Sequence, residues 1–318
     1  MNKINGLYTR RDMLNLGAGL AASTLPGSSW AQAAPQALIT RPIPRTKEPL
    51  PVIGLGTAII FDIGNDATQR AERAKVISTF LAGGARLIDT APSYGSAESV
   101  VGDLLADLKL RDKVFLATKV RSNDNAAFVA QMKQSQQRLR SPKFDLMQLH
   151  NVGFLDRGMM ASQLAIVREW KQQGVFRYIG VTHSQDQPRA NDRLIEIMRQ
   201  ETIDFIQVNY SMAERSVEQR LLAAADTGTA VLCNLPFARG VLFRAVSGNT
   251  VPAWATEAGM ATWGQFFLKY LLGHTAVNAV MPGTDKVEYM LDNLDAGRGQ
   301  MPDAAMRSRM AAHIDALL

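Results

Sequence analysis

The sequence predicts a single-domain α/β protein with the architecture of a (β/α)8 barrel, the TIM-barrel fold. From about residue 50 onward, short apolar runs alternate regularly with amphipathic segments. Near-continuous apolar runs are typical of parallel strands that are covered on both faces. The chain has 318 residues, of which 47% are hydrophobic and 20% are charged. A barrel of this class needs about 250 residues, so the chain is long enough to form one.

Each apolar run is interpreted as one strand of the barrel. The expected strands cover residues 52–56, 86–88, 114–117, 144–149, 178–181, 205–208, 230–233 and 277–281. The expected helices between and after them cover residues 71–81, 99–108, 128–139, 160–173, 188–199, 217–225, 263–272 and 287–294. This repeated alternation favours a closed barrel. A doubly wound sheet is the alternative, but the first strand carries Gly54 and Gly56 without the third glycine of a dinucleotide-binding loop.

Two further segments lie outside the repeat. Residues 37–51 contain four prolines and are interpreted as a lead-in segment, with a hairpin that closes the floor of the barrel. Residues 304–318 are expected to form a terminal helix that packs outside the barrel. No linker or second domain is expected, so the barrel is assigned to residues 34–318.

The first 33 residues differ from the rest of the chain. Lys3, Arg10 and Arg11 form a positive start, an apolar stretch rich in glycine and alanine follows, and residues 31–33 have the small-x-small pattern of a cleavage site. This order is typical of a secretory signal peptide, and the arginine pair resembles a twin-arginine signal. We therefore expect residues 1–33 to be a signal peptide of the twin-arginine type and the mature protein to be periplasmic. A chance arginine pair before a small amphipathic helix is the alternative.

Composition and charge argue against several classes of function. The formal net charge of +6 is spread along the chain, so no nucleic-acid partner is expected. No apolar run approaches the roughly 20 residues that cross a bilayer. Cys233 is the single cysteine, which rules out a disulfide within one chain. No zinc signature is present, so no metal site is expected, and we expect the protein to be a monomer.

Polar residues stand at the carboxyl ends of six of the expected strands. They are Asp89, Lys119, His150, Thr182, Gln207 and Asn234. In a closed barrel these strand ends meet at one mouth, where the active sites of this fold lie. The repeat therefore predicts a polar site at that mouth.

Four residues at or near this mouth suit acid–base chemistry. Asp89 and Lys119 stand on neighbouring strands, and a carboxylate can keep a buried lysine charged. Tyr94 lies on the loop after Asp89, from which its hydroxyl can reach the mouth. A phenol normally ionises at about pH 10, and a neighbouring ammonium makes it usable as an acid near neutral pH. The neutral ring of His150 can donate a hydrogen bond to a carbonyl oxygen.

Each of these residues also has a simpler interpretation. The alternatives are a structural ion pair for Asp89 and Lys119, a loop aromatic for Tyr94, and a core histidine for His150. Their predicted convergence at one mouth favours a functional site over these alternatives.

The chain also resembles the aldo-keto reductase family. The matching segments follow one another along most of the chain: 89–95 (Asp-Thr-Ala-x-x-Tyr-Gly), 117–119, 145–150 (Asp-x-x-x-Leu-His), 179–183, 207–211, 281–284 and 292–293. The resemblance implies a catalytic tetrad of Asp89, Tyr94, Lys119 and His150. It also implies a small carbonyl substrate, with the hydride of a nicotinamide reaching the carbonyl carbon while Tyr94 protonates the oxygen.

The resemblance further implies where the cofactor binds. Gln207 would contact the nicotinamide carboxamide, and the phosphates would lie near residues 235–240 and 283–284, as is usual after the last two strands of such barrels. Arg239 would bind the pyrophosphate, with a solvated arginine as the alternative. The full expected set is Gly56, Thr57, Thr182, His183, Gln207, Asn234, Leu235, Phe237, Arg239, Gly283, Thr284, Lys286, Asp292 and Asn293.

Three sites depart from the family pattern. His183 stands where the family usually has asparagine, and Asn234 and Leu235 stand where an aromatic residue and a serine are common. Tyr289 stands where an arginine often grips the 2′-phosphate of NADP, which leaves Lys286 nearby. NADP is the cofactor that the resemblance implies, and NAD is the alternative.

We expect the protein to be an NADP-dependent enzyme that reduces an aldehyde or a ketone to an alcohol. Two other functions stay open. One is a barrel that binds the cofactor and acts as a redox sensor or partner-binding module with little turnover. The other is a lyase that forms a Schiff base on Lys119, which borohydride trapping would reveal.

Overall fold

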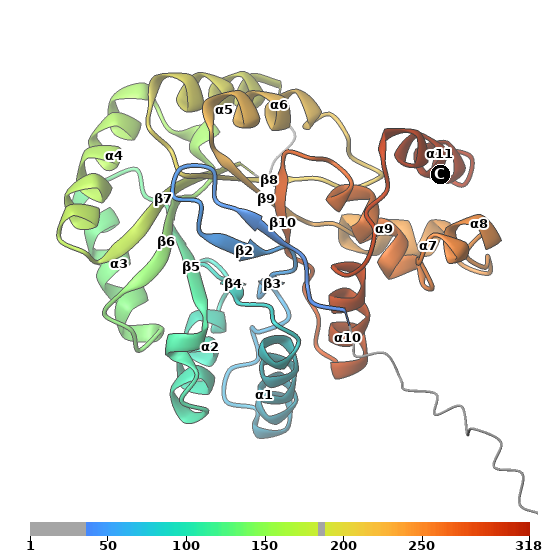
Figure 1. The fold of residues 1–318 in the computed structure, drawn as a ribbon. Coiled ribbons are helices and arrows are strands. Elements are labelled where there is room, and N and C mark those ends of the chain that lie inside the picture. Colours follow the sequence, from blue (N-terminus) through green and yellow to red (C-terminus); the bar gives the residue numbers. More distant parts are fainter. Residues whose placement is uncertain (1–35, 184–187) are drawn as a thin grey trace, which may run out of the picture. The chain divides into compact units, whose positions relative to one another are not determined.

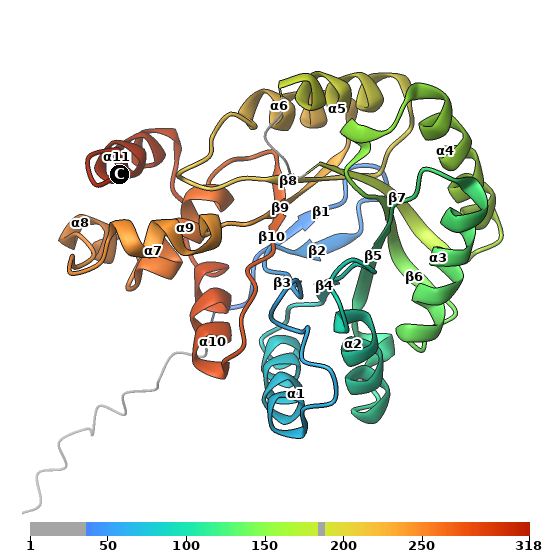
Figure 2. The same cartoon turned by 180° about the vertical axis from the view of Figure 1, so that it is seen from behind.

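The computed structural model describes residues 36–183 and 188–318, so the expected signal peptide at residues 1–33 lies outside the described residues. Its centre is a parallel sheet with the strand order β10-β9-β8-β7-β6-β5-β4-β3 (Figures 1 and 2). The strands are β3 (Leu55–Gly56), β4 (Leu87–Asp89), β5 (Phe115–Val120), β6 (Phe144–Leu149), β7 (Phe176–His183), β8 (Phe205–Asn209), β9 (Ala230–Asn234) and β10 (Val277–Val280).

The two edges of this sheet meet and close it into a barrel. Ile53, just before β3, forms a parallel bridge with Val280 of β10. The amide of Gly54 donates to the Val280 carbonyl at 2.8 Å, and the amide of Val280 donates to the Val52 carbonyl at 2.9 Å. The predicted (β/α)8 barrel is therefore confirmed. The doubly wound alternative is wrong, because such a sheet keeps two open edges.

Helices surround the barrel on its outer side (Figure 1). They are α1 (Ala67–Ala82), α2 (Ala97–Asp107), α3 (Asn125–Arg138), α4 (Arg157–Gln172), α5 (Pro188–Gln200), α6 (Glu218–Thr227), α9 (Trp263–Leu272) and α10 (Val287–Ala296). Apolar periodicity placed the starts of α1, α3 and α4 three or four residues too late. Their true starts are marked by Asp66, Asp124 and Asp156, whose side chains accept a hydrogen bond from the amide three residues on.

The region after β9 contains two short helices that the sequence analysis missed. These are α7 (Val241–Ala245) and α8 (Ala253–Glu257), and they gather beside α9 together with the predicted terminal helix α11 (Ala304–Asp315) (Figure 1). Aromatic contacts join them, since Trp254 of α8 packs against Phe266 at 5.9 Å and His313 of α11 stacks on Trp263 at 6.0 Å. Helices of five residues are too short to show a periodic pattern. The 3-10 turns are η1 (Arg111–Lys113), η2 (Val152–Phe154) and η3 (Ala238–Gly240).

The predicted floor hairpin is present and crosses one end of the barrel (Figure 1). It consists of the antiparallel strands β1 (Thr40–Pro42) and β2 (Pro49–Pro51). The hairpin places Ile43 and Leu50 in the buried core of the barrel. The other members of that core come from the strands: Leu87, Phe115, Ala117, Leu146, Tyr178, Phe205, Ala230, Leu232, Ala279 and Met281.

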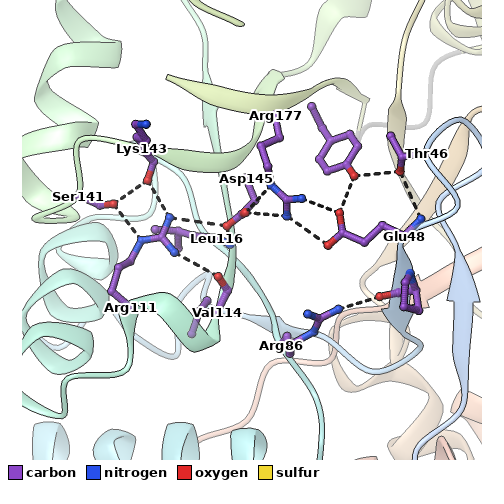
Figure 3. Close-up of polar contacts among 12 residues, drawn as sticks. Thr46, Glu48, Arg86, Arg111, Val114, Leu116, Ser141, Lys143, Asp145 and Arg177 are labelled. Atoms are coloured by element: carbon purple, nitrogen blue, oxygen red, sulfur yellow. Dashed lines mark hydrogen bonds and ion pairs between the residues drawn. The ribbon is translucent and has the colours of Figure 1, made fainter. Parts of the chain in front are cut away.

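A network of charged side chains ties this hairpin to the barrel floor (Figure 3). The Arg177 guanidinium donates to both carboxylate oxygens of Glu48, at 2.6 and 3.2 Å, and forms an ion pair with Asp145 at 2.8 Å. It also lies over the rings of Tyr178 and Phe115, at 5.1 and 5.5 Å from their centres. Asp145 begins the segment 145–150 that resembles a catalytic motif, yet it lies on the floor, at the end of β6 opposite to His150.

In the part of the chain that the structure describes, no helix has both the length and the apolar character needed to cross a membrane.

Candidate functional site

A layer of polar side chains lies above the apolar core, toward the carboxyl ends of the strands. Side chains two positions apart on a strand point to the same face. Each of five strands therefore adds a polar residue two positions after an apolar core residue: Leu87 and Asp89, Ala117 and Lys119, Leu146 and Gln148, Phe205 and Gln207, Leu232 and Asn234. All of these polar residues except Asn234 are buried. The fold thus forms a desolvated polar layer at the predicted mouth.

The centre of this layer is an ion pair between Asp89 and Lys119. Lys119 is fully buried, and its Nζ donates to Asp89 Oδ2 at 2.5 Å and to the Thr90 carbonyl at 2.9 Å. Burial by itself would lower the pKa of Lys119, but the charge of the Asp89 carboxylate and the nearby Tyr94 outweigh it and raise the pKa. The lysine is therefore held in its charged form, as the sequence analysis expected.

The second oxygen of Asp89 accepts hydrogen bonds from two glutamine amides. Gln207 Nε2 lies 2.8 Å and Gln148 Nε2 lies 3.1 Å from Asp89 Oδ1. The hydroxyl of Thr57 donates to the backbone carbonyl of Asp89 at 2.9 Å, which fixes the end of β4. Both carboxylate oxygens are thus engaged. The sequence analysis did not single out Gln148, whose one visible signal is a polar residue between the apolar Met147 and Leu149.

Tyr94 lies at the rim of this layer, half-buried, with its ring above Lys119. The Nζ of Lys119 is 4.8 Å from the centre of the Tyr94 ring, and the His150 ring meets it edge-on at 6.2 Å. The structure therefore brings Asp89, Tyr94, Lys119 and His150 together at one mouth, as predicted from the strand ends.

The loop that carries Tyr94 is anchored by a side chain that the sequence analysis also missed. Asp62, on the loop after β3, accepts hydrogen bonds from the amide of Ser96 at 2.8 Å and from its hydroxyl at 2.9 Å. Gly95 has a φ of 58°, and a Cβ added there would lie 2.3 Å from the Asp62 carboxylate. Only glycine fits this position, which explains the Tyr-Gly pair in the motif.

His150 is electrically neutral over the physiological pH range. Its pKa is lowered to about 3, chiefly by burial and further by electrostatic interactions with Lys119, Arg121 and His183. A neutral imidazole keeps one N–H donor and one acceptor nitrogen. The ring can therefore donate a hydrogen bond to an oxygen at the mouth without adding a charge.

Three of the residues expected around a nicotinamide lie at the same end of the barrel. The Thr182 hydroxyl accepts a hydrogen bond from the amide of Asn151 at 3.1 Å, and His183 is buried at the end of β7. Asn234 ends β9 in register with Asn209. Its buried amide oxygen has no hydrogen-bond partner among residues 36–183 and 188–318. A ligand that donates an N–H group would satisfy this oxygen.

The loops after β3 and β10 approach each other closely, which requires small residues. A Cβ on Gly56 would lie 3.0 Å from the Met281 carbonyl oxygen, and a Cβ on Gly283 would lie 3.2 Å from Ile60 Cγ1. Thr284 accepts a hydrogen bond from the amide of Lys286 at 3.4 Å. The Lys286 ammonium lies 5.2 Å from the ring centre of the exposed Tyr289.

The segment after β9 has an unusual backbone. Leu235, Ala238 and Arg239 have φ values of 50°, 48° and 52°, in the left-handed region that residues other than glycine seldom adopt. Such residues cluster at ligand-binding loops, where the surrounding structure compensates for the strain. The backbone of this segment therefore suits the predicted phosphate site.

Other residues of the expected set are engaged in packing. Phe237 packs against Phe243 at 4.9 Å between ring centres. Asp292 of α10 accepts hydrogen bonds from the Thr262 hydroxyl at 2.9 Å and from Gln265 Nε2 at 2.8 Å, and the next residue, Asn293, is buried. Cofactor contacts by these residues stay predictions. Within the described ranges, no group of acidic, histidine or cysteine side chains is arranged to hold a metal ion.

Comparison with known proteins agrees with this geometry. The model of the aldo/keto reductase family matches residues 52–314. The chain therefore belongs to the aldo/keto reductase family, and it is an NAD(P)H-dependent oxidoreductase of that family.

Known relatives and structures are similar at low sequence identity. The chain is 25% identical over 268 residues to the uncharacterized oxidoreductase YqkF of Bacillus subtilis, covering 73% of this chain and 84% of YqkF. It is 28% identical over 243 residues to the NADH-specific methylglyoxal reductase of Escherichia coli, covering 67% and 72% of the two chains. The crystal structure of an aldo-keto reductase from Klebsiella pneumoniae in complex with NADPH superposes with a TM-score of 0.70 at 23% identity, covering 89% and 95%. At that identity the structural likeness supports the fold.

Proposed function

We propose that the protein reduces an aldehyde or a ketone to an alcohol, with NADPH as the hydride source and Tyr94 as the proton donor. The observation that carries this proposal is the position of the Lys119 ammonium, 4.8 Å from the centre of the Tyr94 ring and 2.5 Å from the Asp89 carboxylate. A cation beside a phenol favours the phenolate that forms once the proton has been given away.

The residues of the mouth divide the reaction between them. Bound reduced nicotinamide supplies a hydride to the carbonyl carbon. The carbonyl oxygen takes the hydroxyl proton of Tyr94, and the ammonium of Lys119 stabilises the phenolate left behind. Asp89 keeps Lys119 charged, and the neutral His150 donates a hydrogen bond that orients the carbonyl oxygen.

Several features of the mouth suit a nicotinamide cofactor. Gln207 uses its amide nitrogen on Asp89, so its amide oxygen would accept a hydrogen bond from the carboxamide. The buried amide oxygen of Asn234 is a second acceptor at the position where an aromatic residue is common in the family. The segment from Leu235 to Arg239, in which three residues have left-handed backbone angles, would hold the phosphates. Thr284 and Lys286 would hold the 2′-phosphate, which favours NADP.

Turnover and cofactor choice can be tested together. Loss of NADPH absorbance should be followed with a panel of aldehydes and ketones, and binding of NADPH and NADH should be titrated by fluorescence. Oxidation that Tyr94→Phe abolishes is the expected result. Much tighter binding of NADH, as in the NADH-specific relative from Escherichia coli, would replace NADP by NAD in the proposal.

Two results would favour the other functions. Cofactor binding without oxidation across the whole panel would favour a redox sensor or binding module. Borohydride trapping of a substrate on Lys119 would favour a lyase. The structure disfavours the lyase, because a Schiff base forms from a neutral amine and the raised pKa of Lys119 keeps it charged.

We also propose that residues 1–33 direct export through the twin-arginine route, on the pattern of their sequence alone. A fusion of these residues to a reporter that is active only outside the cytoplasm should give signal in a host with this route. Replacing Arg10 and Arg11 by lysine should abolish that signal. Equal signal from the two fusions would contradict the proposal.

A further inference from the structure

The proposed mechanism gives no role to Gln148, a buried polar side chain of the mouth. Gln148 is fully buried in the interior of the barrel and lies two residues before His150 in the chain. In the sheet it is paired with Lys119 on β5 and with Gly180 on β7. It therefore lies among the strands that carry the charged pair.

The contacts of Asp89 divide its carboxylate into two halves. Oδ2 faces the ammonium of Lys119 at 2.5 Å, whereas Oδ1 accepts from Gln148 at 3.1 Å and from Gln207 at 2.8 Å. The orientation of the Gln148 amide follows from this arrangement. Turning the amide around would bring its carbonyl oxygen against the carboxylate, with two acceptors in contact.

The fold accommodates Gln148 at a cost. Gly180, its neighbour on β7, has no room for a side chain, since a Cβ there would lie 2.9 Å from Gln148 Cγ. The amide oxygen of Gln148 is buried and has no hydrogen-bond partner in the part of the chain that the structure describes. An unsatisfied buried carbonyl lowers stability, so an aliphatic side chain would serve the core better than glutamine does.

We propose that Gln148 is a positioning residue that tunes the acidity of the Tyr94 hydroxyl through Asp89 and Lys119. Its N–H dipole points at the Asp89 carboxylate and offsets part of the negative charge there. The positive charge of Lys119 then acts more fully on the phenol. This inference deepens the proposed role of Tyr94 and rests on it.

The direction of the effect follows from charge. Without the amide of Gln148, more of the negative charge of Asp89 is felt at Lys119 and at the phenol beyond it. A less positive surrounding disfavours the phenolate. The phenol should then ionise at a higher pH, and the alkaline limb of the pH–rate profile should move in the same direction.

The charged and titratable groups that face Tyr94 allow the shift in its ionisation midpoint to be measured without interference. They are Lys119 on β5, Asp89 on β4, His150 after β6, and Asp62 beside the neighbouring Gly95. His150, with a pKa of about 3, stays neutral in the alkaline range, and hydrogen bonds from Ser96 lower the pKa of Asp62, which stays charged. Neither changes its charge as the phenol ionises.

The test replaces Gln148 by methionine, which has a similar length and no N–H donor. Ionisation of the phenol is followed by its near-ultraviolet absorbance in the full chain without cofactor, after subtraction of the same titration for the Tyr94→Phe protein. The ionisation midpoint in Gln148→Met should rise by about 0.5 pH unit or more, a roughly threefold change in the ionisation constant. An unchanged midpoint in the folded variant would overturn the proposal.

Gln163 provides a matched control. It is also fully buried, its Nε2 donates to the Ser122 carbonyl at 2.7 Å, and its amide oxygen likewise lacks a partner among the described residues. It lies on α4, outside the barrel interior. Gln163→Met removes the same kind of buried amide from the protein and should leave the phenol midpoint unchanged. An equal shift in both variants would mean general loosening of the barrel and would also overturn the proposal.

A measurement on the unmodified protein covers the case in which Gln148→Met does not fold. The side-chain amide signals of Gln148 and Gln207 in an NMR spectrum should move with the same midpoint as the phenol, and Tyr94→Phe should abolish that movement. Absence of any glutamine amide signal with this midpoint would contradict the proposal.

These titrations need no turnover, so the two proposals fail separately. A midpoint that shifts in a protein that reduces no carbonyl would refute the proposed function alone. Conversely, if the protein is an active reductase and Gln148→Met leaves the phenol midpoint unchanged, this inference alone is refuted.

Discussion

The two ends of the barrel each hold an acid paired with a base, and they differ in how much water reaches the pair. At the mouth, the side chains of Lys119 and Asp89 are 0% and 5% exposed. At the floor, those of Arg177 and Glu48 are 49% and 23% exposed (Figure 3). Water screens the floor pair, so its charges act only on their direct partners. The mouth pair is desolvated, and its field extends to Tyr94.

The ends also differ in how completely their polar atoms are bonded. At the floor, Arg177 bonds two carboxylates and lies over two aromatic rings. At the mouth, the Thr90 hydroxyl and the amide oxygens of Gln148 and Asn234 are buried without a hydrogen-bond partner among residues 36–183 and 188–318. A saturated network suits a structural role, whereas unsatisfied groups around a charged pair suit a site that completes its bonding with a ligand.

The largest effect is expected from removal of one oxygen at the mouth. Tyr94→Phe takes away the proposed proton donor and should lower kcat by roughly 10²–10⁴-fold. Fluorescence titration should show unchanged NADPH affinity, because the ring and its contact with Lys119 remain. If the variant kept about a tenth or more of the wild-type kcat, Tyr94 would not be the proton donor.

Breaking the mouth pair should cause the largest loss of stability. Asp89→Asn leaves the ammonium of Lys119 buried without a counter-charge, and losing one partner of a buried pair costs about 3–5 kcal/mol. Urea unfolding of the wild type and the variant measures this loss. The double variant Asp89→Asn/Lys119→Met should lose less than the sum of its single changes, because it leaves no unpaired charge. Additive losses would show that the two side chains do not depend on each other.

The sequence revealed the parts of this architecture that depend on local pattern. Strands buried on both faces appear as apolar runs, and the register of the repeat alone placed Asp89 and Lys119 together. The segment 145–150 also shows a limit of motif matching. It runs from the second residue of β6 to the residue after the strand, so Asp145 lies on the floor and His150 at the mouth, and the motif does not separate these roles.

Features that depend on distant contacts could not be predicted. The role of Gln148 depends on Asp89, which is 59 positions away in the chain. The anchor of the Tyr94 loop is Asp62, 34 positions before Ser96, in a loop without any pattern. In the sequence, Gln148 and Asp62 appear only as isolated polar residues. Their partners come close to them only when the barrel closes.

Acid should weaken the mouth before the floor. The pKa of His150 is lowered to about 3 in the folded protein, against roughly 6.5 when unfolded, so its contribution is present above pH 6.5 and is lost as the pH falls. The loss reaches about 1.4 kcal/mol per pH unit. Burial raises the pKa of Glu48, but hydrogen bonds from Arg177 and Tyr178 and nearby positive charges lower it overall. The contribution of Glu48 therefore persists until the pH falls below the ordinary range of a glutamate.

Urea unfolding at several pH values between about 7 and 5 would measure this difference. His150→Gln should flatten the slope of unfolding free energy against pH, whereas Glu48→Gln should leave the slope in that range unchanged. His274, whose pKa burial also lowers, adds the same background slope to all three proteins. Equal slopes for the wild type and His150→Gln would contradict the assignment.

The smallest effect should come from the floor. Arg177→Met removes the centre of the network in Figure 3, yet the guanidinium is half exposed and its ion pairs are screened, so the loss should be about 1 kcal/mol. The methionine can still cover the rings of Phe115 and Tyr178, which limits the cost to the core. Because water screens the floor charges, kcat and the phenol midpoint of Tyr94 should stay at their wild-type values. A change in either would mean that the floor charges reach the mouth through the barrel, and the contrast between the two ends would fail.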